Sequence, residues 1–116
     1  MPLRILYVEN HEAFAQVVTS SFLGDHDVTV VPSLARARTA VFEDHYDVLI
    51  VDYDLDDGKG AELVRSFRSI GYAVPIVGAS AHDDGNAALE AAGADAVCPK
   101  AKFEEIATVL ADLGLV

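Results

Sequence analysis

The sequence predicts an α/β fold in which helices cover both faces of a five-stranded parallel sheet. Two observations lead to this prediction: short apolar segments alternate with amphipathic ones along the chain, and several apolar segments end abruptly at polar side chains. Strands that are buried on both faces read as continuous apolar runs, a pattern typical of parallel sheets. The 116 residues are enough for one core, so we expect residues 1–116 to form one domain.

The first two repeats span residues 3–42. Residues 3–8 and 28–31 predict strands. We expect Asn10 to cap the first helix and Pro32-Ser33 to open the second. The residues at helical spacing, which we expect to face the core, are Phe14, Val17, Val18 and Phe22 in the first helix and Leu34, Ala37, Val41 and Phe42 in the second.

The other three repeats follow the same plan. Residues 47–52, 73–78 and 94–98 predict the third, fourth and fifth strands. The core-facing residues of the last three helices are predicted to be Leu63, Val64, Phe67 and Ile70, then Ala87, Ala88, Leu89, Ala91 and Ala92, then Phe103, Ile106, Ala107, Leu110 and Leu113. Right-handed crossovers favour a doubly wound sheet of strand order 2-1-3-4-5, in which ligands bind beyond the carboxyl ends of the first and third strands.

Charge and composition exclude several classes of function. Nineteen acidic residues against eight Lys and Arg give a net charge of −11, which disfavours direct binding to nucleic acid or to an anionic membrane. The single cysteine, Cys98, excludes an intrachain disulfide and fits a reducing compartment. The apolar run at the start is too short for a signal peptide or a membrane span. We therefore expect a cytoplasmic protein.

Acidic side chains gather where the first and third strands end. Glu9 and Asn10 follow one strand, and Asp52 and Asp54 follow the other. Asp56 and Asp57 continue the second loop, which predicts a dense acidic pocket. Clustered carboxylates need a neutralising cation, and their hard oxygen atoms suit Mg²⁺. Ser80 and Lys100 follow the fourth and fifth strands, so a hydroxyl and a compact cation join the same edge.

Four motifs in the right order resemble those of response regulator receiver domains, which have a flavodoxin-like fold. They are Ile5-Leu6-Tyr7-Val8-Glu9-Asn10-His11, Val48 to Gly60, Ile76-Val77-Gly78-Ala79-Ser80-Ala81, and Ala92 to Lys100. The resemblance covers essentially the whole chain. It implies a phosphorelay signalling domain rather than an enzyme, one that catalyses its own phosphorylation and dephosphorylation.

The resemblance also implies a role for individual residues. Asp52 would accept a phosphoryl group from a sensor histidine kinase or a histidine phosphotransfer protein. The implied Mg²⁺ ligands are Glu9, Asn10, Asp52 and the backbone carbonyl of Asp54. Ser80 and Lys100 would contact the phosphoryl group. The positions that modulate its lifetime or its readout are Asp54, His82 and Val97. The signal would pass to a downstream effector protein, or to a homodimer, through the face of the fourth helix, fifth strand and fifth helix.

Four positions depart from the family pattern, one of them Asp56, which stands where many members have proline. Asn10 replaces the second acidic residue, which would weaken Mg²⁺ binding. Val97 stands where the family has a mobile aromatic side chain. Ala101 stands where the family has a proline after a cis peptide, and a cis bond before alanine would cost about 3 kcal/mol. An alternative therefore stays open, namely a degenerate receiver that serves as a phosphorylation-independent docking module.

Overall fold

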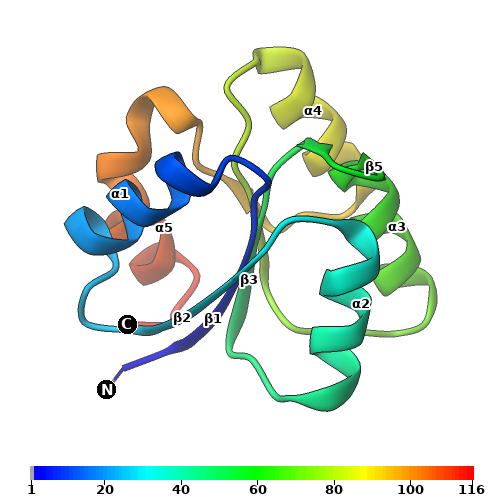
Figure 1. The fold of residues 1–116 in the computed structure, drawn as a ribbon, viewed down its shortest axis with the longest axis horizontal. Coiled ribbons are helices and arrows are strands. Elements are labelled where there is room, and N and C mark those ends of the chain that lie inside the picture. The colour runs from blue at the N-terminus through cyan, green and yellow to red at the C-terminus, as the bar shows by residue number, and fades with distance from the viewer. Residues whose placement is uncertain (1) are drawn as a thin grey trace.

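The computed structural model describes residues 2–116 and contains the predicted five-stranded parallel sheet (Figure 1). Its strand order is β2-β1-β3-β6-β7, which confirms the predicted order of 2-1-3-4-5. The small antiparallel pair β4-β5 was not predicted. The elements are β1 (Arg4–Val8), α1 (Glu12–Phe22), β2 (Asp27–Val31), α2 (Leu34–Glu43), β3 (Val48–Val51), β4 (Asp54–Leu55), β5 (Gly58–Lys59), α3 (Gly60–Ser69), β6 (Ile76–Gly78), α4 (Asp83–Ala92), β7 (Ala96–Val97), the 3₁₀ helix η1 (Lys100–Glu105) and α5 (Ile106–Asp112).

The central strands place alternate side chains in two separate cores, one on each face of the sheet. Ile5 and Tyr7 of β1 join the core beneath α1 and α5. Leu6 and Val8 join the core beneath α2, α3 and α4. All four residues of β3 are fully buried, as a strand covered on both faces requires. Figure 1 shows α1 and α5 on one side of the sheet and α2 and α3 on the other.

Some predicted helix faces are wrong. Phe42 exposes 93% of its surface. The other residues that were predicted to face the core but are exposed are Val17, Phe22, Ile70, Ala87, Ala91 and Ala107. Phe42 and Ile70 stand at the carboxyl ends of α2 and α3, where apolar spacing continues but the neighbouring core does not. The predicted Asn10 cap is also wrong, because α1 begins after His11 and has no side-chain cap. The Ser33 cap of α2 is present: its Oγ accepts a hydrogen bond of 3.1 Å from the Arg36 N–H.

The loop after β7 accommodates Ala101 without a cis peptide bond. No cis peptide bond occurs within residues 2–116. The chain turns into η1 at Lys100, so the predicted fifth helix is split into a 3₁₀ segment and α5. The backbone of Lys102 is non-helical, which places a kink within η1 itself. Across the described residues, no helix has the length and apolar character needed to cross a membrane.

Candidate functional site

Four polar residues follow the carboxyl ends of neighbouring strands. The strand register aligns Val8 with Val51, Val51 with Gly78, and Gly78 with Val97. The chain continues from these aligned ends to Glu9, Asp52, Ser80 and Lys100. The parallel register therefore brings residues from four distant parts of the sequence to one edge of the sheet.

Lys100 joins the two carboxylates of this edge. Its Nζ lies 2.6 Å from Glu9 Oε1 and 3.1 Å from Asp52 Oδ2. Glu9 and Asp52 are only 1% and 5% exposed. The Glu9 Oε1 contact is an ion pair without aligned hydrogen-bond geometry, which leaves this oxygen with unused acceptor capacity. Two buried carboxylates against one ammonium leave a net negative charge in the site.

Asp52 is a weaker acid than an exposed aspartate. Burial, followed by the charge of Glu9, raises the pKa of Asp52 to about 6, while Lys100 acts in the opposite direction. Its Oδ1 accepts a hydrogen bond of 2.8 Å from the Tyr53 N–H. The carboxylate thus has a fixed orientation and an incompletely neutralised charge. These properties suit a nucleophile beside which a bound cation would neutralise the remaining charge.

A shallow cavity of about 260 Å³ opens onto Asp52. Ser80, His82 and Lys100 line it, as predicted for one site, together with Asn10 and Asp54. The Ser80 Oγ accepts a hydrogen bond of 3.1 Å from the His82 N–H. Val97 is not part of this lining. It is half-buried on β7, and its Cγ1 lies against the backbone of Gly78.

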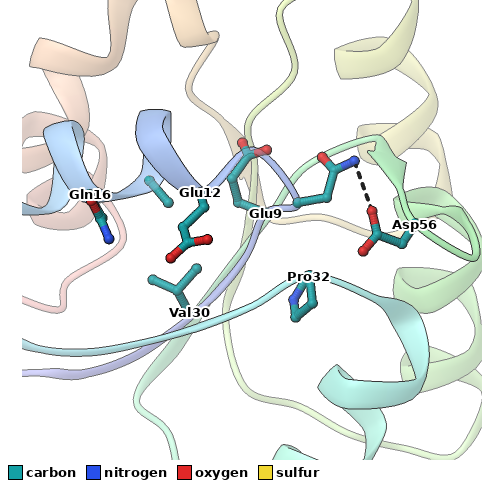
Figure 2. Close-up of a pocket in the computed structure, with 8 residues that line it drawn as sticks. Glu9, Glu12, Gln16, Val30, Pro32 and Asp56 are labelled. Atoms are coloured by element: carbon teal, nitrogen blue, oxygen red, sulfur yellow. Dashed lines mark hydrogen bonds between the residues drawn. The ribbon is translucent and has the colours of Figure 1, made fainter.

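A second cavity lies on the other side of Glu9 (Figure 2). Glu9, Glu12 and Asp56 bring carboxylates to its wall, and Pro32 and Val30 provide apolar surface. The Asn10 Nδ2 donates a hydrogen bond of 3.3 Å to Asp56 Oδ1. Asn10 therefore stands between the two cavities, with its amide nitrogen turned toward Asp56.

The predicted acidic pocket is smaller than expected. Asp57 is not part of it, because its carboxylate accepts hydrogen bonds from the Leu34 and Ala35 N–H groups at the start of α2. Asp54 forms an ion pair with Lys59 within the β4-β5 hairpin. Among these acidic residues only Glu9 and Asp52 are buried, and both contact Lys100. Asp54 and Asp56 are exposed to solvent, and the Asp57 carboxylate lies at the start of α2.

The chemistry of the donors fits Mg²⁺. Glu9 and Asp52 supply two carboxylates, and the Asn10 side chain supplies an amide oxygen, all of them hard ligands. Within residues 2–116, no cluster of three or more His, Cys, Asp or Glu side chains has metal-binding geometry.

Phe14 and Asn86 are among the residues at the site that were not identified from the sequence. Phe14, expected only in the core, lines the cavity, and its ring lies 5.0 Å from Lys100 Nζ. Asn86, in the first turn of α4, is a buried amide that contacts Ser80. A lone asparagine beside an alanine-rich helix face was a usable signal for Asn86, whereas nothing in the sequence distinguished Phe14 from a core residue.

Comparison with known proteins decides the family. The model of the response regulator receiver domain matches residues 5–111 of this chain. The chain belongs to the response regulator receiver family. Receiver domains of two-component response regulators are signalling domains and are not generally classed as enzymes.

Curated relatives of this receiver domain are longer proteins. The two-component response regulator PhoP of Pseudomonas aeruginosa is 34% identical over 109 residues, which cover 90% of this chain and 48% of that protein. Protein RcaC of Microchaete diplosiphon is 33% identical over 98 residues, which cover 80% of this chain and 15% of that protein. The chain spans less than half the length of the curated relatives it matches.

Solved structures share the fold of this receiver domain. The receiver domain of the Francisella response regulator 1452 has a TM-score of 0.85 at 21% identity and covers 96% of this chain and 95% of its own. TrrA of Thermotoga maritima, in complex with Mg²⁺ and BeF, has a TM-score of 0.85 at 20% identity and covers 97% of this chain and 99% of its own.

Proposed function

We propose that this receiver domain accepts a phosphoryl group on Asp52 from a phosphohistidine of a sensor kinase or phosphotransfer protein. The observation that carries the proposal is the placement of Asp52. Its carboxylate is buried at the end of β3, lies 3.1 Å from Lys100 Nζ and opens onto the cavity that Ser80 lines. The description of PhoP as a two-component response regulator supports the same role.

The transfer is an in-line displacement at phosphorus. A carboxylate oxygen of Asp52 attacks the phosphorus, and an O–P bond forms while the N–P bond to the donor imidazole breaks. The imidazole nitrogen keeps the electron pair of the broken bond and takes up a proton. Lys100 and the Ser80 hydroxyl stabilise the negative charge on the phosphoryl oxygens. Water attack on the same phosphorus later releases phosphate and restores Asp52.

Glu9, Asn10 and Asp52, together with the backbone carbonyl of Asp54, are the proposed Mg²⁺ ligands. When bound, Mg²⁺ would neutralise carboxylate charge and polarise the phosphoryl oxygens. Asn10 contributes a neutral amide, so the site has one ligand charge fewer than a set of three carboxylates. We therefore expect weak Mg²⁺ binding, at millimolar concentrations.

The signal passes to other proteins through the face of α4, β7 and α5. His82 precedes α4 and also lines the Asp52 cavity, so it stands between the site and this face. His82, Asp54 and Val97 are placed to modulate the lifetime of the phosphoryl group or its readout. The partners are the donor protein and a downstream effector in the cytoplasm, and self-association through this face is a second possible output.

Acetyl phosphate labelling, followed by intact-mass spectrometry, tests the proposal. We expect a single Mg²⁺-dependent phosphoryl adduct that Asp52→Asn abolishes. Asp25→Asn is the matched control, because Asp25 is exposed and remote from the site, and it should label like the unmodified chain. An adduct that persists in Asp52→Asn would overturn the assignment of Asp52.

The second candidate function is a phosphorylation-independent docking module. It is favoured by two observations: Lys100 contacts both buried carboxylates, and the Asn10 amide donates a hydrogen bond to Asp56. Lys100 thus neutralises part of the carboxylate charge from within the chain. Absence of any adduct, together with unchanged amide NMR spectra up to millimolar Mg²⁺, would favour this function over phosphotransfer.

A further inference from the structure

The side-chain amide of Asn86 forms hydrogen bonds with both backbone polar groups of Ser80. The Ser80 N–H donates a hydrogen bond of 2.8 Å to Asn86 Oδ1, and Asn86 Nδ2 donates one of 3.1 Å to the Ser80 carbonyl. Asn86 is only 7% exposed and lies in the first turn of α4. Because these two hydrogen bonds are buried, water does not readily replace either partner, and they hold the Ser80 backbone in one orientation.

The same carbonyl connects Asn86 to the other side of the site. The Ser80 oxygen also accepts a hydrogen bond of 3.1 Å from the backbone N–H of Lys100. One oxygen atom thus links α4, the loop after β6 and the loop after β7. The two residues that would contact the phosphoryl group, Ser80 and Lys100, are both attached to this junction.

Gly85 allows α4 to approach the Ser80 side chain directly. A Cβ atom at residue 85 would lie 2.3 Å from Ser80 Oγ and 2.9 Å from Ser80 Cβ. The first turn of α4 is therefore in contact with both the peptide and the side chain of Ser80. Close contacts of packed atoms transmit displacement, because the interior has little free space to absorb it.

An ordinary structural role would also bury an asparagine here. In that case the amide would only satisfy polar groups of the loop, and its loss would lower stability without altering how the site communicates with α4. The junction with Lys100 argues for more than this role, since the hydrogen bonds of Asn86 converge on Ser80, the residue that would contact the phosphoryl group.

We propose that Asn86 is a positioning residue of the phosphoryl site, which makes Ser80 and the first turn of α4 move as one unit. This inference rests on the proposed function, in which Ser80 contacts a phosphoryl group on Asp52. Displacement of Ser80 toward the phosphoryl group then pulls α4, and the output face changes without a mobile aromatic side chain at Val97.

Amide NMR of the full chain with Mg²⁺ and beryllofluoride, a phosphoryl analogue, tests this inference. In the unmodified chain we expect shifts at Tyr53, beside Asp52, and along α4. In Asn86→Ala we expect the shift at Tyr53 to persist while the shifts of residues 87–92 fall by about fivefold, as for the loss of a coupling between two sites. Without ligand, hydrogen exchange of the Ser80 amide should accelerate in the same variant.

Two further variants keep the test decisive. Leu89→Ala is the matched control, because Leu89 is fully buried in α4 and packs on Gly78, away from the Ser80 peptide. It should destabilise the helix yet keep the ligand-induced shifts. If Asn86→Ala does not fold, Asn86→Asp replaces it, since this variant keeps the acceptor for the Ser80 N–H and removes the donor to the Ser80 carbonyl.

The possible failures are distinguishable. Full-size α4 shifts in Asn86→Ala, or in Asn86→Asp when it is the variant measured, would overturn the inference and leave the proposed function intact. Loss of the α4 shifts in Leu89→Ala as well would also overturn it, because any loosening of α4 would then suffice. No shift at Tyr53 in the unmodified chain would overturn the proposed function and this inference together.

Discussion

Asp52 combines burial with an incompletely neutralised charge. Its carboxylate shares one ammonium with Glu9, and burial raises the pKa of Asp52 to about 6. The folded state therefore binds a proton at Asp52 more tightly than the unfolded chain does. With a pKa of about 6 the carboxylate is still mostly ionised at neutral pH, and its charge needs a further cation, which suits a phosphoryl acceptor.

The raised pKa of Asp52 makes stability depend on pH. A group with a raised folded-state pKa contributes stability that is fully present below its unfolded pKa and is lost as the pH rises through its folded pKa. The contribution of Asp52 should thus be lost as the pH rises through about 6. We expect Asp52→Asn to raise the free energy of unfolding by about 2 kcal/mol at neutral pH and to flatten its dependence on pH in this range. Urea unfolding at a series of pH values measures both, and an unchanged pH slope would contradict the shifted pKa.

Lys100 is expected to stabilise the fold through the two carboxylates that it contacts. Replacing it by methionine leaves two buried negative charges without a partner, and we expect a loss of about 3 kcal/mol. Lys102→Met is the control, because Lys102 is exposed and forms none of these ion pairs. A double variant with Asp52→Asn should recover part of the loss in urea unfolding. Equal effects of the Lys100 and Lys102 substitutions would argue against the buried ion-pair network.

At the scale of elements, the loop from β3 to α3 determines where Asp52 lies. The Gly60 N–H donates a hydrogen bond to the Tyr53 carbonyl at 2.6 Å. A Cβ atom at residue 60 would lie 1.9 Å from the Asp52 carbonyl oxygen. The β4-β5 hairpin thus folds back until the start of α3 touches the backbone of Asp52, the proposed phosphoacceptor.

Gly60→Ala should therefore displace the Asp52 peptide. We expect a loss of about 2–3 kcal/mol, within the range for overpacked sites, together with slower phosphorylation. Gly24→Ala is the control, because a Cβ atom there would meet its nearest atom, the Ser20 carbonyl oxygen, at an ordinary 3.4 Å. Thermal unfolding and acetyl phosphate labelling of both variants check this expectation. Normal labelling of Gly60→Ala would mean that the loop does not position Asp52.

The strands were predictable from sequence because their apolar runs are bounded by polar residues. The run from Val48 to Val51 is bounded by Asp47 and Asp52, which favoured a buried strand, and the candidate site lies at its carboxyl end. The helix ends were less predictable, since Asn10 hydrogen-bonds to Asp56 rather than capping α1. Asp57 was misplaced because its role depends on α2, which lies far away in sequence. Contacts between segments that are far apart in the sequence leave no local pattern from which they could be predicted.

At the scale of the whole molecule, the net charge of −11 is unevenly distributed. From α4 to the end of the chain only Lys100 and Lys102 are basic, and Lys100 is engaged in the site. The acidic residues of the same stretch are Asp83, Asp84, Glu90, Asp95, Glu104, Glu105 and Asp112. Two copies that met through α4, β7 and α5 would therefore bring like charges together.

Self-association through this face should depend strongly on salt. We expect the protein to be monomeric at low ionic strength, and any dimer formed on phosphorylation to strengthen as salt screens the carboxylates. Sedimentation equilibrium with beryllofluoride and Mg²⁺ at increasing NaCl concentration measures this dependence. A dimer that weakens with added salt would place the interface on another face.

The central claim is that Asp52 carries the phosphoryl group. Its most direct test is reduction of the labelled protein with borohydride, which converts an aspartyl phosphate to homoserine, followed by peptide mass spectrometry. We expect homoserine at residue 52, formed only after incubation with both acetyl phosphate and Mg²⁺. Homoserine at another aspartate, or at none while the unmodified chain remains folded, would contradict the claim.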